Sequence, residues 1–212
     1  MPVQVRPRVP LNNTSCGLKS PSKATNMFIQ TEETPNPNAL KFFPDQSVSP
    51  NEPVFFNKRN DALHKSSLAI KIFDIENIEA VFYGKDFITV TKSEKIDWSL
   101  VKSEILMVIM DHFVAGHPVF DKVQDDTKQI DTDSMSDIEK QIVEIIETRV
   151  RPSVAMDGGD IIYKGFENGI VYLQLRGACS GCPSASVTLK NGIESMLKHF
   201  VPEVNSVESI EE

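Results

Sequence analysis

The sequence predicts an α+β fold with two small domains joined by an acidic linker. Stretches with the apolar–polar alternation of strands are interspersed with stretches whose apolar residues have helical spacing. Residues 118–135 are rich in aspartate and poor in apolar residues, which is typical of a solvated spacer. A chain of 212 residues is long enough for a small domain on each side of this spacer. We therefore expect domains at residues 27–117 and 136–212.

The first domain is predicted to run strand, strand, helix, strand, strand, helix. Proline fixes φ and asparagine tolerates unusual backbone angles, so Thr34-Pro35-Asn36-Pro37-Asn38 should form the turn between the first two strands. His64 and His112 are single histidines on the two predicted helices, and we expect surface or core roles for them rather than metal binding. The expected elements are strands at 28–32 and 39–43, a helix at 62–73, strands at 78–83 and 87–91, and a helix at 98–113.

The second domain is predicted as a helix, a β-hairpin, a loop with two cysteines, a second helix and a short edge strand. Ser136 and Glu139 have capping-box spacing at the start of the first helix, and Pro152 should end that helix. Asn168-Gly169 between two apolar runs is a strong signal for a hairpin turn. The other expected elements are strands at 161–166 and 170–175, a helix at 184–200 and an edge strand at 204–210.

Composition argues against several classes of function. The formal net charge is −8, so the chain lacks the broad basic surface that nucleic-acid binding requires. No apolar run approaches the roughly 20 residues of a membrane span. Three cysteines, two of them in one motif, do not form a disulfide framework and indicate metal or thiol chemistry in a reducing compartment. We expect neither nucleic acid nor a membrane as a partner.

Residues 1–26 differ in composition from the rest of the chain. They carry arginine and lysine but no acidic residue, and they are rich in serine, threonine and asparagine, as mitochondrial targeting segments are. Pro2, Pro7 and Pro10 argue against the amphipathic helix of such a segment. We therefore favour a disordered lead or a start at Met27, with Cys16 as an incidental thiol. The expected location is a bacterial cytoplasm, with the mitochondrial matrix as the alternative.

Two cysteines, Cys179 and Cys182, lie between the last predicted hairpin strand and the helix that follows it. Unpaired N–H groups at a helix start favour the thiolate, which is the metal-binding form of cysteine. Gly177 and Gly181 remove side-chain bulk, so the backbone can approach a large inorganic core. This spacing suits a redox dithiol, half of a zinc site or half of an iron–sulfur site.

Two thiolates fill only half of a four-coordinate site. Two copies of the chain related by a two-fold axis would supply four thiolates to one centre, so we expect a homodimer when the centre is bound. Four thiolates match a [4Fe–4S] cluster, and they also satisfy a tetrahedral zinc ion. Asp157 and Asp160 flank two glycines without a further carboxylate or histidine at ligand spacing, so we interpret that segment as a turn.

Two segments together resemble the Nfu family. Met156-Asp157-Gly158-Gly159-Asp160 and Gly177-Ala178-Cys179-Ser180-Gly181-Cys182-Pro183-Ser184 resemble the C-terminal domain of NifU. The stretch from Phe28 to Phe43, with Thr34-Pro35-Asn36-Pro37-Asn38 and Leu40-Lys41-Phe42, is similar to the N-terminal domain of Nfu proteins of mitochondria and their bacterial relatives. The resemblance covers nearly everything from Met27 onward.

The resemblance implies a scaffold or carrier rather than an enzyme. Such a protein would hold a [4Fe–4S] cluster between two subunits through Cys179 and Cys182, receive it from upstream assembly proteins and deliver it to apo iron–sulfur proteins. Two alternatives remain on the residues alone, a zinc-bridged structural dimer and a thioredoxin-like dithiol oxidoreductase. Against the dithiol enzyme, no βαβ unit is predicted before the motif and no aromatic residue precedes Cys179. For the N-terminal domain we expect a role in partner docking.

Overall fold

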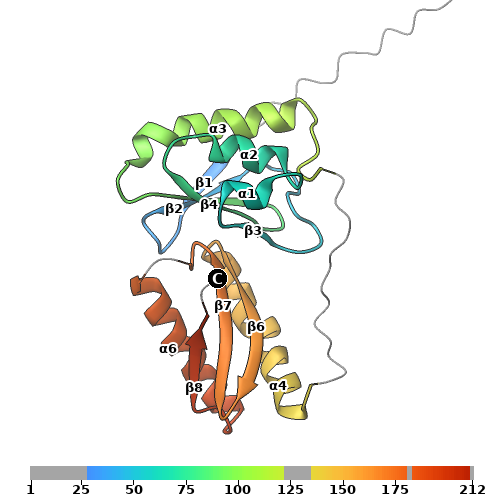
Figure 1. The fold of residues 1–212 in the computed structure, drawn as a ribbon, viewed down its shortest axis with the longest axis vertical. Coiled ribbons are helices and arrows are strands. Elements are labelled where there is room, and N and C mark those ends of the chain that lie inside the picture. The colour runs from blue at the N-terminus through green and yellow to red at the C-terminus, as the bar shows by residue number, and fades with distance from the viewer. Residues whose placement is uncertain (1–27, 122–134, 181–182, 211–212) are drawn as a thin grey trace, which may run out of the picture.

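The computed structural model describes residues 28–121, 135–180 and 183–210, with the backbone alone for residues 183–186 (Figure 1). It confirms the α+β class and the two domains, each of which has its own sheet and its own apolar core. The predicted lead at 1–26 and most of the acidic linker lie outside the described residues. None of the helices within the described ranges has the length and hydropathy to span a bilayer.

The N-terminal domain is a five-stranded antiparallel sheet with its helices packed on one face (Figure 1). The strands lie in the order β1-β2-β5-β4-β3, so β5 is central and β1 and β3 are the edges. Side chains alternate between the helix-covered core and the opposite face of the sheet. The elements are β1 (Gln30–Glu33), β2 (Ala39–Phe43), β3 (Val54–Phe56), α1 (Arg59–Ala62), α2 (Ser67–Phe73), β4 (Ile78–Tyr83), β5 (Ile88–Lys92) and α3 (Trp98–Val114).

Two features of this domain differ from the prediction. The helix expected at 62–73 is two helices, because His64 has a positive φ of 62° and the Ser66 hydroxyl caps α2 by accepting a hydrogen bond from the Ala69 amide. The Ser66 hydroxyl also donates to the Val119 carbonyl, a tertiary contact that no local pattern indicates. β3 was not predicted, since three residues are too few to show an alternation.

His112, for which a surface or core role was expected, is a buried core residue.

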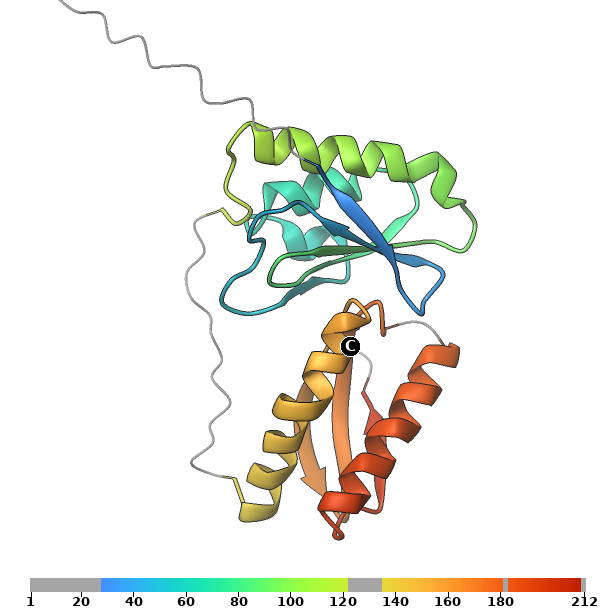
Figure 2. The ribbon, with the colours of Figure 1, turned by 180° about the vertical axis from the view of Figure 1, so that it is seen from behind.

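The C-terminal domain is a three-stranded sheet with both long helical segments on one face (Figure 2). β6 (Gly159–Glu167) and β7 (Ile170–Gly177) form the predicted antiparallel hairpin around Asn168 and Gly169, both of which have positive φ. α6 (Pro183–Phe200) then crosses back to β8 (Ser206–Ser209), which pairs parallel to β7 at the edge of the sheet. The predicted order of helix, hairpin, helix and edge strand is confirmed.

The first helical segment is longer than predicted, because Pro152 does not end it. α4 (Asp137–Ile145) passes through a π-helical stretch (Ile146–Val150) into α5 (Arg151–Met156), with the proline in the first turn of α5. The wider π turn relieves the lost hydrogen bond and the ring clash that proline introduces into a regular helix. The predicted capping box is present. The Ser136 amide donates to the Glu139 carboxylate, which lowers the pKa of that carboxyl.

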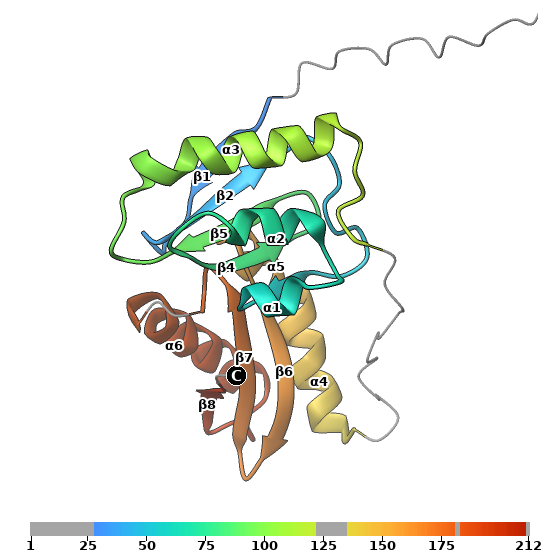
Figure 3. The same cartoon turned by 45° about the horizontal axis from the view of Figure 1, so that its top comes forward.

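The cysteine end of the C-terminal domain lies against the N-terminal sheet (Figure 3). At this end α5 stops at Met156, β6 starts at Gly159, β7 stops at Gly177 and α6 starts at Pro183. The sheet face turned toward it is the face away from α1, α2 and α3. The fold therefore brings the predicted cysteine loop to the boundary between the two domains.

Candidate metal centre

Cys179 lies in a tight turn between β7 and α6. β7 ends at Gly177, whose φ of +70° favours glycine. The amide and the hydroxyl of Ser180 both donate to the Gly177 carbonyl, at 3.1 and 2.9 Å, and this closes the turn around Cys179. The position between strand and helix is the one predicted from sequence. Cys182 and Gly181 lie outside the described residues, so their place in the site stays a prediction.

The side chain of Cys179 is buried and rests against Gly159. The residue is 5% exposed and belongs to the apolar core of the C-terminal domain. A Cβ atom at position 159 would lie 2.8 Å from Cys179 Sγ and 2.6 Å from the Arg176 carbonyl oxygen. Only glycine fits there, so Gly159 forms the floor under the thiol. Sequence reasoning assigned this glycine to a turn and missed its contact with the cysteine.

The missing side chain of Gly177 allows neighbouring chain segments to pack closely against its backbone. A Cβ atom there would lie 2.7 Å from the Gly158 carbonyl oxygen and 3.0 Å from Cγ of Phe82 in the N-terminal domain. The prediction was that its missing side chain would make room for an inorganic core. In the described structure that space is filled by β6 and by Phe82.

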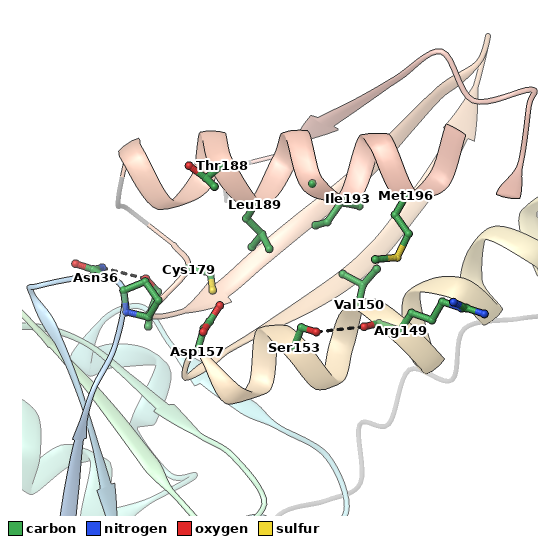
Figure 4. Close-up of a pocket in the computed structure, with 13 residues that line it drawn as sticks. Asn36, Arg149, Val150, Ser153, Asp157, Cys179, Thr188, Leu189, Ile193 and Met196 are labelled. Carbon is green, nitrogen blue, oxygen red and sulfur yellow. Dashed lines mark hydrogen bonds between the residues drawn. The ribbon is translucent and has the colours of Figure 1, made fainter. Parts of the chain in front are cut away.

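The two aspartates near the glycine pair have different environments. Asp160 is buried, and its carboxylate lies 3.0 Å from Nε of Arg151 in an ion pair that is not aligned as a hydrogen bond. Arg151 also donates to the Ile161 carbonyl, so the pair fixes α5 to β6. Asp157 faces the space below Cys179 (Figure 4). Within the described ranges, no three His, Cys, Asp or Glu side chains gather as a metal site.

A cavity of about 390 Å³ opens beside Cys179, between α5 and α6 (Figure 4). Away from the cysteine Val150, Ile193 and Met196 face one another, and Arg149 and Ser153 add polar groups to the lining. Near the cysteine its lining includes Asp157 and, from the N-terminal domain, Asn36. A space of this size has room for a group larger than a single ion.

Comparison with known proteins identifies the family. The model "Scaffold protein Nfu/NifU N terminal" matches residues 29–116, and "NifU-like domain" matches residues 142–208. The human protein "NFU1 iron-sulfur cluster scaffold homolog, mitochondrial" is 48% identical over 187 residues, which cover 87% of this chain and 72% of that protein. The chain belongs to the Nfu/NifU scaffold family. This confirms the resemblance inferred from the two sequence motifs.

Two further proteins are similar to this chain, one by sequence and one among the solved structures. The Drosophila ananassae protein of the same name is 45% identical over 192 residues, 89% of this chain and 66% of that protein. The chain thus spans just under two thirds of the length of that relative. The solution structure of a NifU-like protein from Saccharomyces cerevisiae is 29% identical and covers 46% of this chain and 87% of its own, with a TM-score of 0.42.

Proposed function

We propose that the chain is an iron–sulfur cluster carrier that holds a [4Fe–4S] cluster between two copies of itself, with Cys179 and Cys182 of each copy as ligands. The observation that carries this proposal is the position of Cys179. It lies in a turn between a strand and a helix, over a glycine and beside a cavity, in a chain whose relatives are named iron–sulfur cluster scaffolds. The scaffold names also favour a role without catalysis.

The coordination chemistry follows from the ligand count. A [4Fe–4S] cluster takes four cysteine thiolates, and the motif supplies two per chain. A two-fold axis through the cluster would complete the set. α6 starts one residue after Cys182, and the unpaired N–H groups of a helix start stabilise the thiolate form of nearby cysteines.

Transfer to an acceptor needs no general acid or base. Each chain holds the cluster by two bonds only, so the thiolates of an apo iron–sulfur protein would replace them stepwise. We infer that upstream assembly proteins load the carrier and that apo-proteins unload it. We favour the mitochondrial matrix, the alternative location, because the relatives are named mitochondrial and residues 1–26 are basic and free of acidic residues.

The fold around the motif disfavours the dithiol alternative. The motif follows an antiparallel hairpin, β6 and β7, rather than the βαβ unit that precedes the cysteines of a thioredoxin-like enzyme. A zinc ion would take the same four thiolates, so the experiment must separate the two metals.

Anaerobic reconstitution with iron and sulfide tests the proposal. We expect a brown protein with broad visible absorption and equal amounts of iron and sulfide, because a [4Fe–4S] cluster contains four of each. A parallel sample incubated with zinc gives the colourless reference. A protein that stays colourless after exposure to iron and sulfide, or that as metal-free protein turns over an insulin disulfide, would contradict the carrier function.

A further inference from the structure

The sheet face of the N-terminal domain that points away from its helices is buried. Lys41, Thr89 and Phe82 are direct neighbours across β2, β5 and β4, and none of them belongs to the helix-covered core. Thr89 is 0% exposed and Lys41 is 5% exposed. A threonine and a lysine on the open side of a sheet are normally solvated. Here the cysteine end of the C-terminal domain covers them.

Three side chains of the N-terminal domain donate hydrogen bonds to main-chain carbonyls around the cysteine turn. The Thr89 hydroxyl donates to the Gly158 carbonyl at 2.9 Å, and the Lys41 ammonium to the Met156 carbonyl at 2.8 Å. The Asn36 amide donates at 3.0 Å to the carbonyl of Ala178, the residue before Cys179 (Figure 4). These bonds hold both chain segments that position the thiol.

The contacts with the glycines are equally close. A Cβ atom on Gly158 would lie 3.0 Å from both Lys41 and Thr89, and one on Gly177 would lie 3.0 Å from Phe82. The Gly158 carbonyl also accepts the Ala178 amide at 3.1 Å, so the Thr89 contact connects directly to the cysteine turn. Gly158 and Gly159, the glycine pair after α5, therefore leave room for the docked N-terminal domain and for the thiol of Cys179 respectively.

This interface is suited to opening. Its cross-domain hydrogen bonds use polar donors that water can satisfy after separation, so undocking leaves no donor buried without a partner. Lys41 is further held by the rings of Phe43 and Phe87, at 5.0 and 4.9 Å, and both belong to its own domain. Polar contacts between domains of one chain are typical of pairs that move relative to each other.

The docked arrangement conflicts with a cluster shared between two chains. Pro35 and Asn36 of the N-terminal domain line the same cavity as Cys179, and Cys179 is buried in this arrangement. A second chain must bring its own thiolates close to Cys179 to complete four ligands. We propose that the N-terminal domain is a cover for the cysteine site, and that it undocks before two chains share a cluster. This regulation rests on the carrier function proposed above.

Two substitutions weaken the cover with minimal change in shape. Asn36→Asp keeps the Oδ1 atom that accepts the Asn38 amide, but it replaces the amide donor with an oxygen that faces the Ala178 carbonyl. Thr89→Val keeps the volume and removes the hydroxyl. The matched controls are Asn38→Asp, which keeps the oxygen that accepts from Lys92, and Thr91→Val on the same strand. Among the described residues the Thr91 hydroxyl has no hydrogen-bond partner.

The readout is the alkylation rate of Cys179 in the metal-free full chain, followed by peptide mass spectrometry so that Cys16 and Cys182 are counted separately. Alkylation of a buried thiol follows the population of the open form, so the loss of one hydrogen bond should raise the rate about fivefold. Asn36→Asp and Thr89→Val should both show this increase and load a cluster faster, while the controls stay within twofold of the unmodified chain.

An unchanged alkylation rate of Cys179 in both variants, or an equal rise of this rate in the controls, would contradict the proposal that the N-terminal domain covers the cysteine site. Circular dichroism of each variant verifies that the fold is retained. Cluster loading of the unmodified chain separates the two proposals. If that chain binds no iron while Asn36→Asp and Thr89→Val still expose Cys179, the carrier function fails and the cover stands as a thiol-protecting contact. If the unmodified chain loads a cluster normally and neither substitution changes the alkylation rate of Cys179, only the proposed cover is refuted.

Discussion

Alanine in place of Cys179 or Cys182 should abolish cluster binding. In the proposed shared site, each substitution removes two of the four thiolates, and the two that remain leave half of the cluster's coordination unfilled. After anaerobic reconstitution, the iron content should fall from about four per two chains to near zero, and the visible absorption should vanish. Iron and sulfide analysis after removal of unbound metal measures the loss.

Cys16→Ala is the matched control, since it removes a thiol outside both family-matched domains. It should leave cluster content unchanged. The far-ultraviolet circular dichroism of metal-free Cys179→Ala should match that of the unmodified chain, because the change removes a single sulfur atom from the core. If Cys182→Ala retained a full cluster, the assigned ligand set would be wrong.

Gly159→Ala should damage both the fold and the site. The new methyl group would lie 2.6 Å from the Arg176 carbonyl oxygen on the paired strand and 2.8 Å from Cys179 Sγ. Backbone of a paired strand does not shift freely, so we expect an overpacking cost of about 2 kcal/mol. The thiol must also move, so cluster loading should fall together with stability. Urea denaturation of the metal-free chain measures the first effect, and iron content the second.

Gly165→Ala provides the control on the same strand. A Cβ atom at position 165 meets nothing within 4 Å, so the free energy of unfolding should change by less than about 0.5 kcal/mol. Cluster content should stay at the level of the unmodified chain. Equal losses in the two variants would mean that β6 tolerates no side chain at either glycine, and the specific role of Gly159 under the thiol would be refuted.

Local signals in the sequence predicted most of the C-terminal domain. Asn168-Gly169 specifies its hairpin because both residues adopt positive φ, and Ser136 with Glu139 specifies the start of α4. Each of these signals acts over a few residues, so it can be recognised without knowledge of distant contacts. Pro152 misled the prediction because the π turn before it, which lets the helix continue, has no sequence signature.

The environment of the thiol could not be predicted in the same way. Asn36 is indistinguishable from an ordinary turn asparagine in sequence, and its partner Ala178 lies 142 residues away. Gly159 is one of two adjacent glycines, and only the fold shows that its neighbour is the sulfur of Cys179. The cysteine spacing indicates the chemistry, whereas the groups that cover and support the thiol depend on how the two domains dock.

The mass of the iron-loaded species, measured under argon by native mass spectrometry together with iron and sulfide analysis, tests the central claim most directly. Two chains that each supply two thiolates predict a species of twice the chain mass with about four iron and four sulfide. A single chain that carries a complete four-iron cluster, with no added thiol to fill the remaining positions, would contradict the shared site.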